Sequence, residues 1–189
     1  MNYKISVSGS ANNNCATGAY KKSYEVGRQI ALNGCILITG ATIGIPQWAT
    51  RGAKSVGGVS IGLSPAVSKQ AHVNTYHLPV KYMDLIIYTG FDYSGRNMLM
   101  TRSCDAVITI CGRIGTLNEF TTAFEDRRVV GVLTGTGGVE TEIDEILRLA
   151  KRGRKRIVFD DDPKRLVAKV IQLIRVNERQ KYAKQKETN

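Results

Sequence analysis

The sequence has no long hydrophobic run and little proline. None of its apolar stretches is long enough to span a membrane as a helix. Four prolines beside nineteen glycines indicate a folded chain with many tight turns rather than a disordered one. The N-terminal segment 1–14 lacks the charged and apolar regions of a secretory signal. We therefore expect a cytoplasmic protein.

Cysteines are few, and none of the four forms the CxxC pair typical of a zinc site. We therefore expect no metal site. In a cytoplasmic protein thiols stay reduced, so we expect Cys15, Cys35, Cys104 and Cys111 to be reduced thiols in the core.

Acidic residues are scarce: 16 Asp and Glu stand against 27 Lys and Arg, which gives a net charge of +11. Such a charge suits either nucleic acid or phosphorylated small molecules. Much of it is local, in KRGRKR (151–156) and in the tail 177–189. The sequence contains no helix-turn-helix, zinc-finger or aromatic RNA-binding signature, and a charge run is usually a solvated face. We expect neither a nucleic-acid nor a membrane partner.

Apolar, strand-like runs alternate with segments of helical periodicity along the chain. The predicted strands are 4–9, 35–40, 59–64, 84–90, 105–111, 128–135 and 154–160; the predicted helices are 20–34, 46–58, 94–104, 116–127, 139–153 and 162–182; segment 65–82 is irregular. Continuous apolar strands indicate a parallel sheet covered on both faces. We predict an α/β, Rossmann-like fold: an open, mostly parallel twisted sheet of about seven strands with helices on both faces. One domain would cover 1–176, followed by a basic helical tail over 177–189.

Five loops should meet at the carboxyl edge of this sheet, where open parallel sheets bind ligands. They are SGSANNN (8–14), TGATIGIP (39–46), TGFDYSGRN (89–97), CGRIGTLNE (111–119) and LTGTGG (133–138). Glycine-rich turns that lead into helices form anion sites. None of the loops matches GxGxxG or GxxxxGK[ST], which argues against ordinary dehydrogenases and P-loop NTPases.

CGRIGTLNE resembles the PGGxGTxxE motif of the LOG family, phosphoribohydrolases once misnamed lysine decarboxylases. GRNMLM (95–100) is similar to the arginine-and-methionine segment of that family, ISVSGS (5–10) to its first strand and loop, and segment 39–66 to its second loop, helix and third strand. The resemblance covers roughly residues 4–150. It is closer still to an uncharacterised LOG-like, nucleotide-binding branch that also has a GTGG segment like 135–138.

The resemblance implies an AMP-like nucleoside 5′-monophosphate ligand and a homodimer with sites near its interface. In enzymatic members the N-glycosidic bond is hydrolysed to free base and ribose 5-phosphate, with no metal or other cofactor. Arg96 and Glu119 match the catalytic pair, and Gly112, Gly115 and Thr116 match the phosphate loop. The remaining candidate nucleotide-binding residues are Gly9, Ser10, Thr39, Gly40, Gly44, Asn97, Arg113 and Ile114.

Several alternatives stay open. Cys111 replaces the proline of the motif and Arg113 its second glycine, so Arg113 would be strained if that position needs a positive φ. Thr116 and Glu119 also have the spacing of a capping box, in which Glu119 would only bond back to the Thr116 N–H. We expect His72 and His77 on the surface, outside the site. The alternative function is a non-catalytic carrier of a nucleotide or of a phosphorylated, molybdenum-cofactor-type pterin, because the LOG-like group is similar to such carriers.

Overall fold

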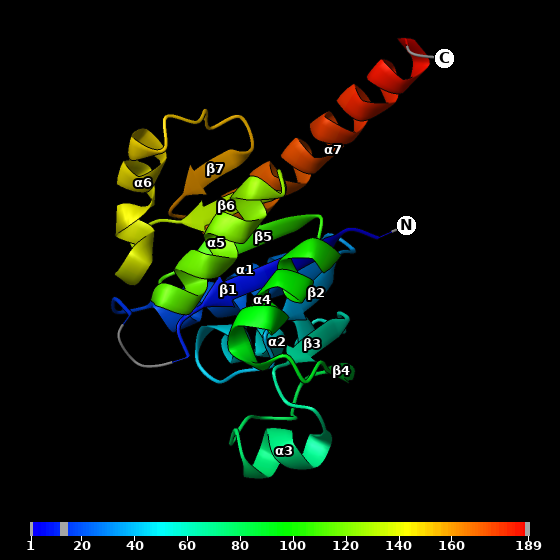
Figure 1. The fold of residues 1–189 in the computed structure, drawn as a ribbon, viewed down its shortest axis with the longest axis vertical. Coiled ribbons are helices and arrows are strands. Elements are labelled where there is room, and N and C mark those ends of the chain that lie inside the picture. The colour runs from blue at the N-terminus through cyan, green and yellow to red at the C-terminus, as the bar shows by residue number, and fades with distance from the viewer. Residues whose placement is uncertain (1, 12–14, 188–189) are drawn as a thin grey trace.

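Seven parallel strands form one sheet in the computed structural model, which describes residues 2–11 and 15–187 (Figure 1). The strands are β1 (Lys4–Gly9), β2 (Ile36–Thr39), β3 (Ser60–Ser64), β4 (Leu85–Tyr88), β5 (Ala106–Ile110), β6 (Val129–Leu133) and β7 (Ile157–Asp160). Their spatial order is β4-β3-β2-β1-β5-β6-β7. The interior strand β5 (AVITI) and its neighbour β6 (VVGVL) are buried at every residue, as strands covered on both faces must be. The predicted Rossmann-like α/β fold is confirmed.

Helices cover both faces of this sheet. They are α1 (Ala19–Leu32), α2 (Ile45–Lys54), α3 (Lys69–Asn74), α4 (Asp92–Ser103), α5 (Ile114–Glu125), the 3-10 helix η1 (Gly138–Glu142), α6 (Ile143–Leu149) and α7 (Pro163–Glu187). The apolar residues of α1, α2 and α7 share one core cluster with β1 and β5. Those of α5 and α6 pack on the other face of β5 and β6, and those of α4 pack on β2 and β3. Alternate residues of β2, β5 and β6 belong to core clusters on opposite faces of the sheet, as the period of a strand requires.

The order of the strands reverses at β1, which pairs with β2 on one side and with β5 on the other. Strands β2 to β4 follow on the first side, and β5 to β7 follow on the second. The helices that follow β1 and β5 therefore leave on opposite faces, and a crevice opens between the two carboxyl ends. This is the position where open α/β sheets bind ligands.

One segment differs from the sequence-based expectation. The region 65–82, predicted to be irregular, contains α3, whose N-cap Ser68 accepts a hydrogen bond from the Ala71 N–H at 3.1 Å. Six residues are too few for periodicity to reveal a helix. At the C-terminal end, α7 runs from Pro163 to Glu187 and includes most of the residues of the basic tail. None of the described helices is both long and apolar enough to cross a membrane.

A disulfide joins Cys15, just before α1, to Cys111, just after β5. The Cα atoms lie 5.7 Å apart, within the usual range for a disulfide. The expectation of four reduced thiols is therefore wrong for this pair, whereas Cys35 and Cys104 are free and buried. The two partners are 96 residues apart in sequence. The pairing of β1 with β5 brings their loops together, and no local pattern reveals this.

Reduction of this disulfide should lower the free energy of unfolding by about 2–4 kcal/mol, because it releases a closed loop of 96 residues in the unfolded chain. Chemical denaturation with and without a phosphine reductant measures the change. Cys15→Ser is the control: its stability should match that of the reduced protein and should not respond to reductant. A wild-type protein that is equally stable in both conditions would contradict the prediction.

Candidate functional site

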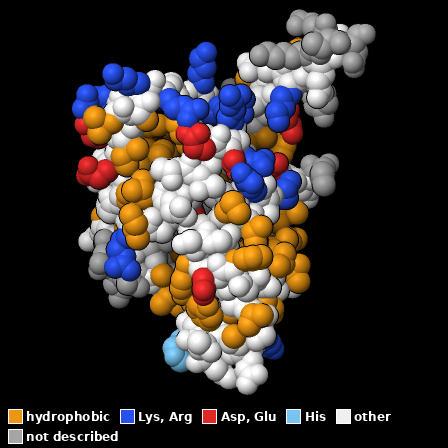
Figure 2. Space-filling model, viewed as in Figure 1, with side chains coloured by type: hydrophobic (Ala, Val, Ile, Leu, Met, Phe, Trp, Pro, Cys, Tyr) orange, Lys and Arg blue, Asp and Glu red, His pale blue; other side chains and the backbone are white. Residues whose placement is uncertain are grey.

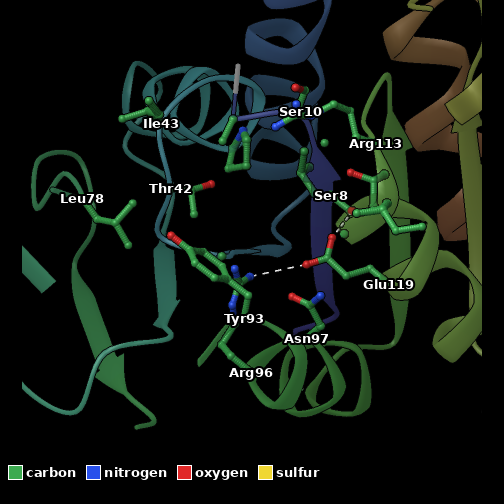
Figure 3. Close-up of a pocket in the computed structure, with 18 of the residues that line it drawn as sticks. Ser8, Ser10, Thr42, Ile43, Leu78, Tyr93, Arg96, Asn97, Arg113 and Glu119 are labelled. Carbon is green, nitrogen blue, oxygen red and sulfur yellow. Dashed lines mark hydrogen bonds and ion pairs between the residues drawn. The ribbon is translucent and has the colours of Figure 1, made fainter. Parts of the chain in front are cut away.

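A cavity of about 570 Å³ lies at the carboxyl ends of β1 and β2 (Figure 3). Its walls come from the end of β1, the loop after β2, the helices α4 and α5, and segment 76–78. The volume falls within the range of small-molecule sites. This is the position at which the strand order predicts a ligand site.

A buried ion pair, Arg96 of α4 with Glu119 of α5, forms one wall of the cavity. Figure 3 shows the two side chains pointing toward each other, with Nη1 of Arg96 3.4 Å from Oε1 of Glu119. Only 5% and 8% of these side chains are exposed. Ser8, at the end of β1, donates its hydroxyl to Oε2, the other carboxylate oxygen. Both oxygens of Glu119 are therefore held by side chains from two different elements.

The buried position of Glu119 changes the pKa of its carboxyl group. Burial raises the pKa of its carboxyl group, while the charge of Arg96 and the hydrogen bond from Ser8 oppose that rise. Desolvation disfavours the charged form, and a nearby cation favours it. A buried pair of this kind is costly to break, because removal of one partner leaves an uncompensated charge.

The capping-box interpretation of Glu119 is wrong. Helix α5 begins at Ile114 with Arg113 as its N-cap, so Thr116 lies inside the first turn. From there Glu119 is one turn further along and points to Ser8 and Arg96 instead of back to the helix end. The Thr-to-Glu spacing alone does not reveal this, because the helix starts two residues before Thr116.

The loop that leads into α5 follows a path of its own. Arg113 is extended, with φ −134°, so its replacement of glycine causes no backbone strain. The positive φ values fall instead on Cys111 (54°) and Gly112 (97°). Proline, with φ fixed near −65°, does not fit the conformation of Cys111. The loop can therefore follow this path with cysteine at position 111 but not with the proline of the motif.

The GTGG segment anchors this loop. The Cys111 N–H donates to Oγ1 of Thr136 at 2.8 Å, and the Val139 N–H donates to the Gly112 carbonyl at 3.0 Å. Thr136 is itself held by the buried Glu140, whose carboxylate accepts from the backbone N–H groups of residues 135–137 at 2.8–3.1 Å. A network of backbone and side-chain bonds thus fixes the start of α5, where the helix dipole favours an anion.

Gly40 makes room for the guanidinium group of Arg96. A Cβ at position 40 would lie 2.0 Å from Nη1 of Arg96, a distance that no side-chain contact tolerates. Figure 3 shows Tyr93 beside the same guanidinium group, which lies 5.9 Å from its ring centroid. Gly40, directly after β2, therefore leaves space for Arg96 in addition to forming the turn.

The cavity brings together most of the predicted site residues. Those that line it are Gly9, Ser10, Gly40, Arg96, Asn97, Arg113, Ile114, Gly115, Thr116 and Glu119. Three others do not: Thr39 is buried in β2, Gly44 is the N-cap of α2, and Gly112 lies against the side chain of Thr116. These three shape the loops beside the cavity.

Sequence reasoning missed a second group of lining residues: Ser8, Thr42, Ile43, Tyr76, His77, Leu78 and Tyr93. Several come from the segment after α3, which lines the cavity but carries no motif. Tyr76 donates its hydroxyl to Asp92 and packs edge to face on Tyr93, with ring centroids 5.9 Å apart. This contact joins the segment to α4.

The two histidines differ in position. The expectation of surface histidines is wrong for His72, which is fully buried and bonded to Ser64 Oγ at 2.8 Å and to the Pro79 carbonyl at 3.0 Å. His77 is exposed, as expected, but it lines the cavity. Among the described residues, no group of three or more His, Cys, Asp or Glu side chains is arranged to hold a metal ion.

Comparison with known proteins gives a matching family, a relative by sequence and similar structures. A model of the SLOG cluster4 family matches residues 2–167. An uncharacterized protein of Archaeoglobus fulgidus is 29% identical over 119 residues, which are 63% of this chain and 73% of the relative. The molybdenum cofactor carrier protein of Chlamydomonas reinhardtii is similar in structure, with a TM-score of 0.74 and 26% identity over 92% of this chain and 99% of that one. The molybdenum cofactor binding protein of Rippkaea orientalis, at 24% identity, shares the fold, with a TM-score of 0.77 over 92% and 98% of the two chains.

Gly40→Ala should displace Arg96 and lower the free energy of unfolding by about 1–3 kcal/mol, because the added methyl group overpacks a buried contact. Chemical denaturation measures the loss. Gly153→Ala is the matched control, since a Cβ there meets no described atom within 4 Å. Equal stability of the two variants would show that Arg96 does not depend on Gly40.

Proposed function

The chain belongs to the SLOG cluster4 family, and on this premise we propose that its cavity binds a nucleoside 5′-monophosphate and hydrolyses the N-glycosidic bond. The products would be a free base and ribose 5-phosphate. The observation that carries this proposal is the buried pair of Arg96 and Glu119, held by Ser8 and placed in the cavity beside the start of α5.

The ligand phosphate would bind at the first turn of α5. Thr116 and the backbone of Gly115 line the cavity there, and the first amide groups of a helix have no partner within the helix. The positive end of the helix dipole and the guanidinium group of Arg113 would add to the attraction. The base would lie against the apolar wall formed by Ile43, Leu78 and Tyr93.

Glu119 would act on the ribose. Cleavage of a glycosidic bond passes through an oxocarbenium-like state, which a nearby carboxylate stabilises while it orients the attacking water. The charge of Arg96 favours the ionised carboxylate and so opposes the rise in pKa that burial causes. Ser8 fixes Oε2 of Glu119. The ribose would therefore approach Oε1, from the side of the carboxylate that faces Arg96. The chemistry needs no group beyond these side chains and water.

A second candidate function is that of a non-catalytic carrier for a phosphorylated pterin or nucleotide. The likeness to the Chlamydomonas reinhardtii molybdenum cofactor carrier protein, at 26% identity, favours it. The same first turn of α5 would then hold the phosphate, and the apolar wall would hold the planar rings. Under this function Glu119 would serve binding alone.

Glu119→Gln should reduce base release by at least about a hundredfold while it retains nucleotide binding, because the amide keeps the shape of the carboxylate but lacks its charge. Chromatography after incubation with AMP, GMP, IMP, CMP and UMP measures release, and thermal shift measures binding. Since burial raises the pKa of Glu119, wild-type release should fall on acidification at a pH above the usual range of a glutamate.

Two outcomes separate the candidates. Thermal stabilisation by a nucleotide or pterin phosphate without any release by the wild-type protein supports the carrier. Release that persists in Glu119→Gln removes Glu119 from the mechanism.

We also propose that the chain forms a homodimer through the outer edge of β4. Leu85 and Ile87 of this edge strand are 52% and 46% exposed, and Phe91 and Met98 of the adjoining loop and helix are 63% and 45% exposed. Figure 2 shows hydrophobic side chains gathered on the lower part of this face, over the region of α4 and β4 in Figure 1. An apolar group of this kind at an unpaired strand is typical of an interface.

Ile87→Lys should convert the dimer to a monomer, because it would place a charge in the interface. Light scattering during size-exclusion chromatography measures the mass. Leu149→Lys is the control, since Leu149 is 65% exposed on α6, away from β4. A wild-type protein that elutes as a monomer at high concentration would refute the proposed interface.

A further inference from the structure

A second cavity, of about 260 Å³, lies at the amino edge of the sheet, opposite the edge that carries the nucleotide pocket. It is enclosed by the starts of β5, β6 and β7 and by the second half of α7. Its lining residues are Asp105, Asp126, Arg127, Arg128, Val129, Arg156, Ile174, Asn177, Glu178 and Lys181. None of them takes part in the site described above.

The acidic residues at this edge already have partners. Asp105 pairs with Lys4 at 2.9 Å, Asp126 pairs with Arg102 at 2.9 Å, and Glu178 accepts from the hydroxyl of Tyr3 at 2.7 Å. The charges of Asp105 and Asp126 are therefore already balanced by cations, whereas Glu178, bonded to a neutral hydroxyl, keeps its own charge in the cavity.

Five cations at this edge form no ion pair with an acidic side chain among the described residues. These amino-edge cations are Arg127, Arg128, Lys155, Arg156 and Lys181. Two of them donate to backbone oxygens: the guanidinium group of Arg128 donates to the Arg102 carbonyl at 2.7 Å, and that of Arg156 donates to the Arg127 carbonyl. Their charges remain available to an anion.

Two buried donor atoms beside the cavity also lack an acceptor. Nε of Arg128 and Nδ2 of Asn177 are buried and make no hydrogen bond within the described structure. A buried donor without an acceptor costs free energy. The oxygens of an anion in this cavity would supply acceptors at a place where the local charge is already positive.

The amino-edge cations come from three parts of the sequence: 127–128, the end of the KRGRKR run, and α7. Read as a sequence, KRGRKR is an isolated charge run on a solvated face. The sheet brings its end beside Arg127 and Lys181. Figure 2 shows Lys and Arg side chains gathered at the top of the view, over the end of the molecule that carries the α6–β7 connection and α7 in Figure 1.

The positive surface is larger than the area that one small anion would cover. Lys155 lies outside the cavity and extends the positive charge beyond it, whereas Arg152 and Arg154 beside it are paired with Glu125 and Asp144. Among the side chains that the structure describes, none that lines the cavity is aromatic and could stack on a base. These features fit a ligand that is bound through a chain of phosphates, without contacts that distinguish its bases.

We propose that the amino edge binds the phosphodiester backbone of a nucleic acid. The contacts are to phosphates, and the affinity is therefore independent of base sequence and strongly dependent on salt. This site is separate from the nucleotide pocket and does not rest on the function proposed for it.

Fluorescence anisotropy with a labelled DNA duplex and a single strand of the same length, titrated across salt, tests the proposal. If all five cations contact phosphates, log K should fall against log salt with a slope of about −4.5 for the duplex. The variant Arg127→Gln/Arg156→Gln/Lys181→Gln should weaken binding at low salt at least tenfold and flatten the slope by about 2.7. Lys155→Gln/Lys181→Gln, which removes two exposed lysines, should flatten it by about 1.8.

The matched control is Lys21→Gln/Lys69→Gln/Lys164→Gln, which removes three exposed lysines located away from this edge; it should retain wild-type affinity and slope. AMP at saturating concentration and Glu119→Gln should also leave binding unchanged. Absence of binding at low salt would overturn the proposal. Equal loss in the control variant, or competition by AMP, would overturn it too, because the nucleic acid would then bind by general charge or in the nucleotide pocket.

Discussion

The buried pair of Arg96 and Glu119 is the constraint on which the rest of the site depends. Two charges removed from water are stable only while each is held by the other and by further polar contacts. Ser8 supplies one such contact, and Gly40 leaves the space that the guanidinium group needs. A strand end, a loop and two helices must therefore meet at one position. The geometry of the cavity follows from that requirement.

The fold was predictable because its signals are local. Continuous apolar runs mark buried parallel strands, and the glycines after them mark the ligand edge. Most of the predicted site residues line the cavity for this reason. The wall from segment 76–78 was not predictable, because it follows a six-residue helix and acts through Tyr76 and Leu78, which carry no motif.

Long-range geometry accounts for the other differences. The spacing of Thr116 and Glu119 fits a helix cap, and only the true start of α5 and the arrival of Ser8 from β1 show that Glu119 points elsewhere. The pairing of Cys15 with Cys111 and the convergence of cations at the amino edge likewise join residues far apart in sequence. A one-dimensional pattern contains none of these contacts.

The disulfide gives the chain a covalent ring that runs from Cys15 to Cys111 and contains β2 to β5 with α1 to α4. The ring closes beside the start of α5. A single cut by a protease anywhere inside it would leave both pieces attached to each other. Arg96, inside the ring, and Glu119, outside it, would then remain on one covalent molecule, so the two walls of the pocket would stay together after the backbone between them had been severed.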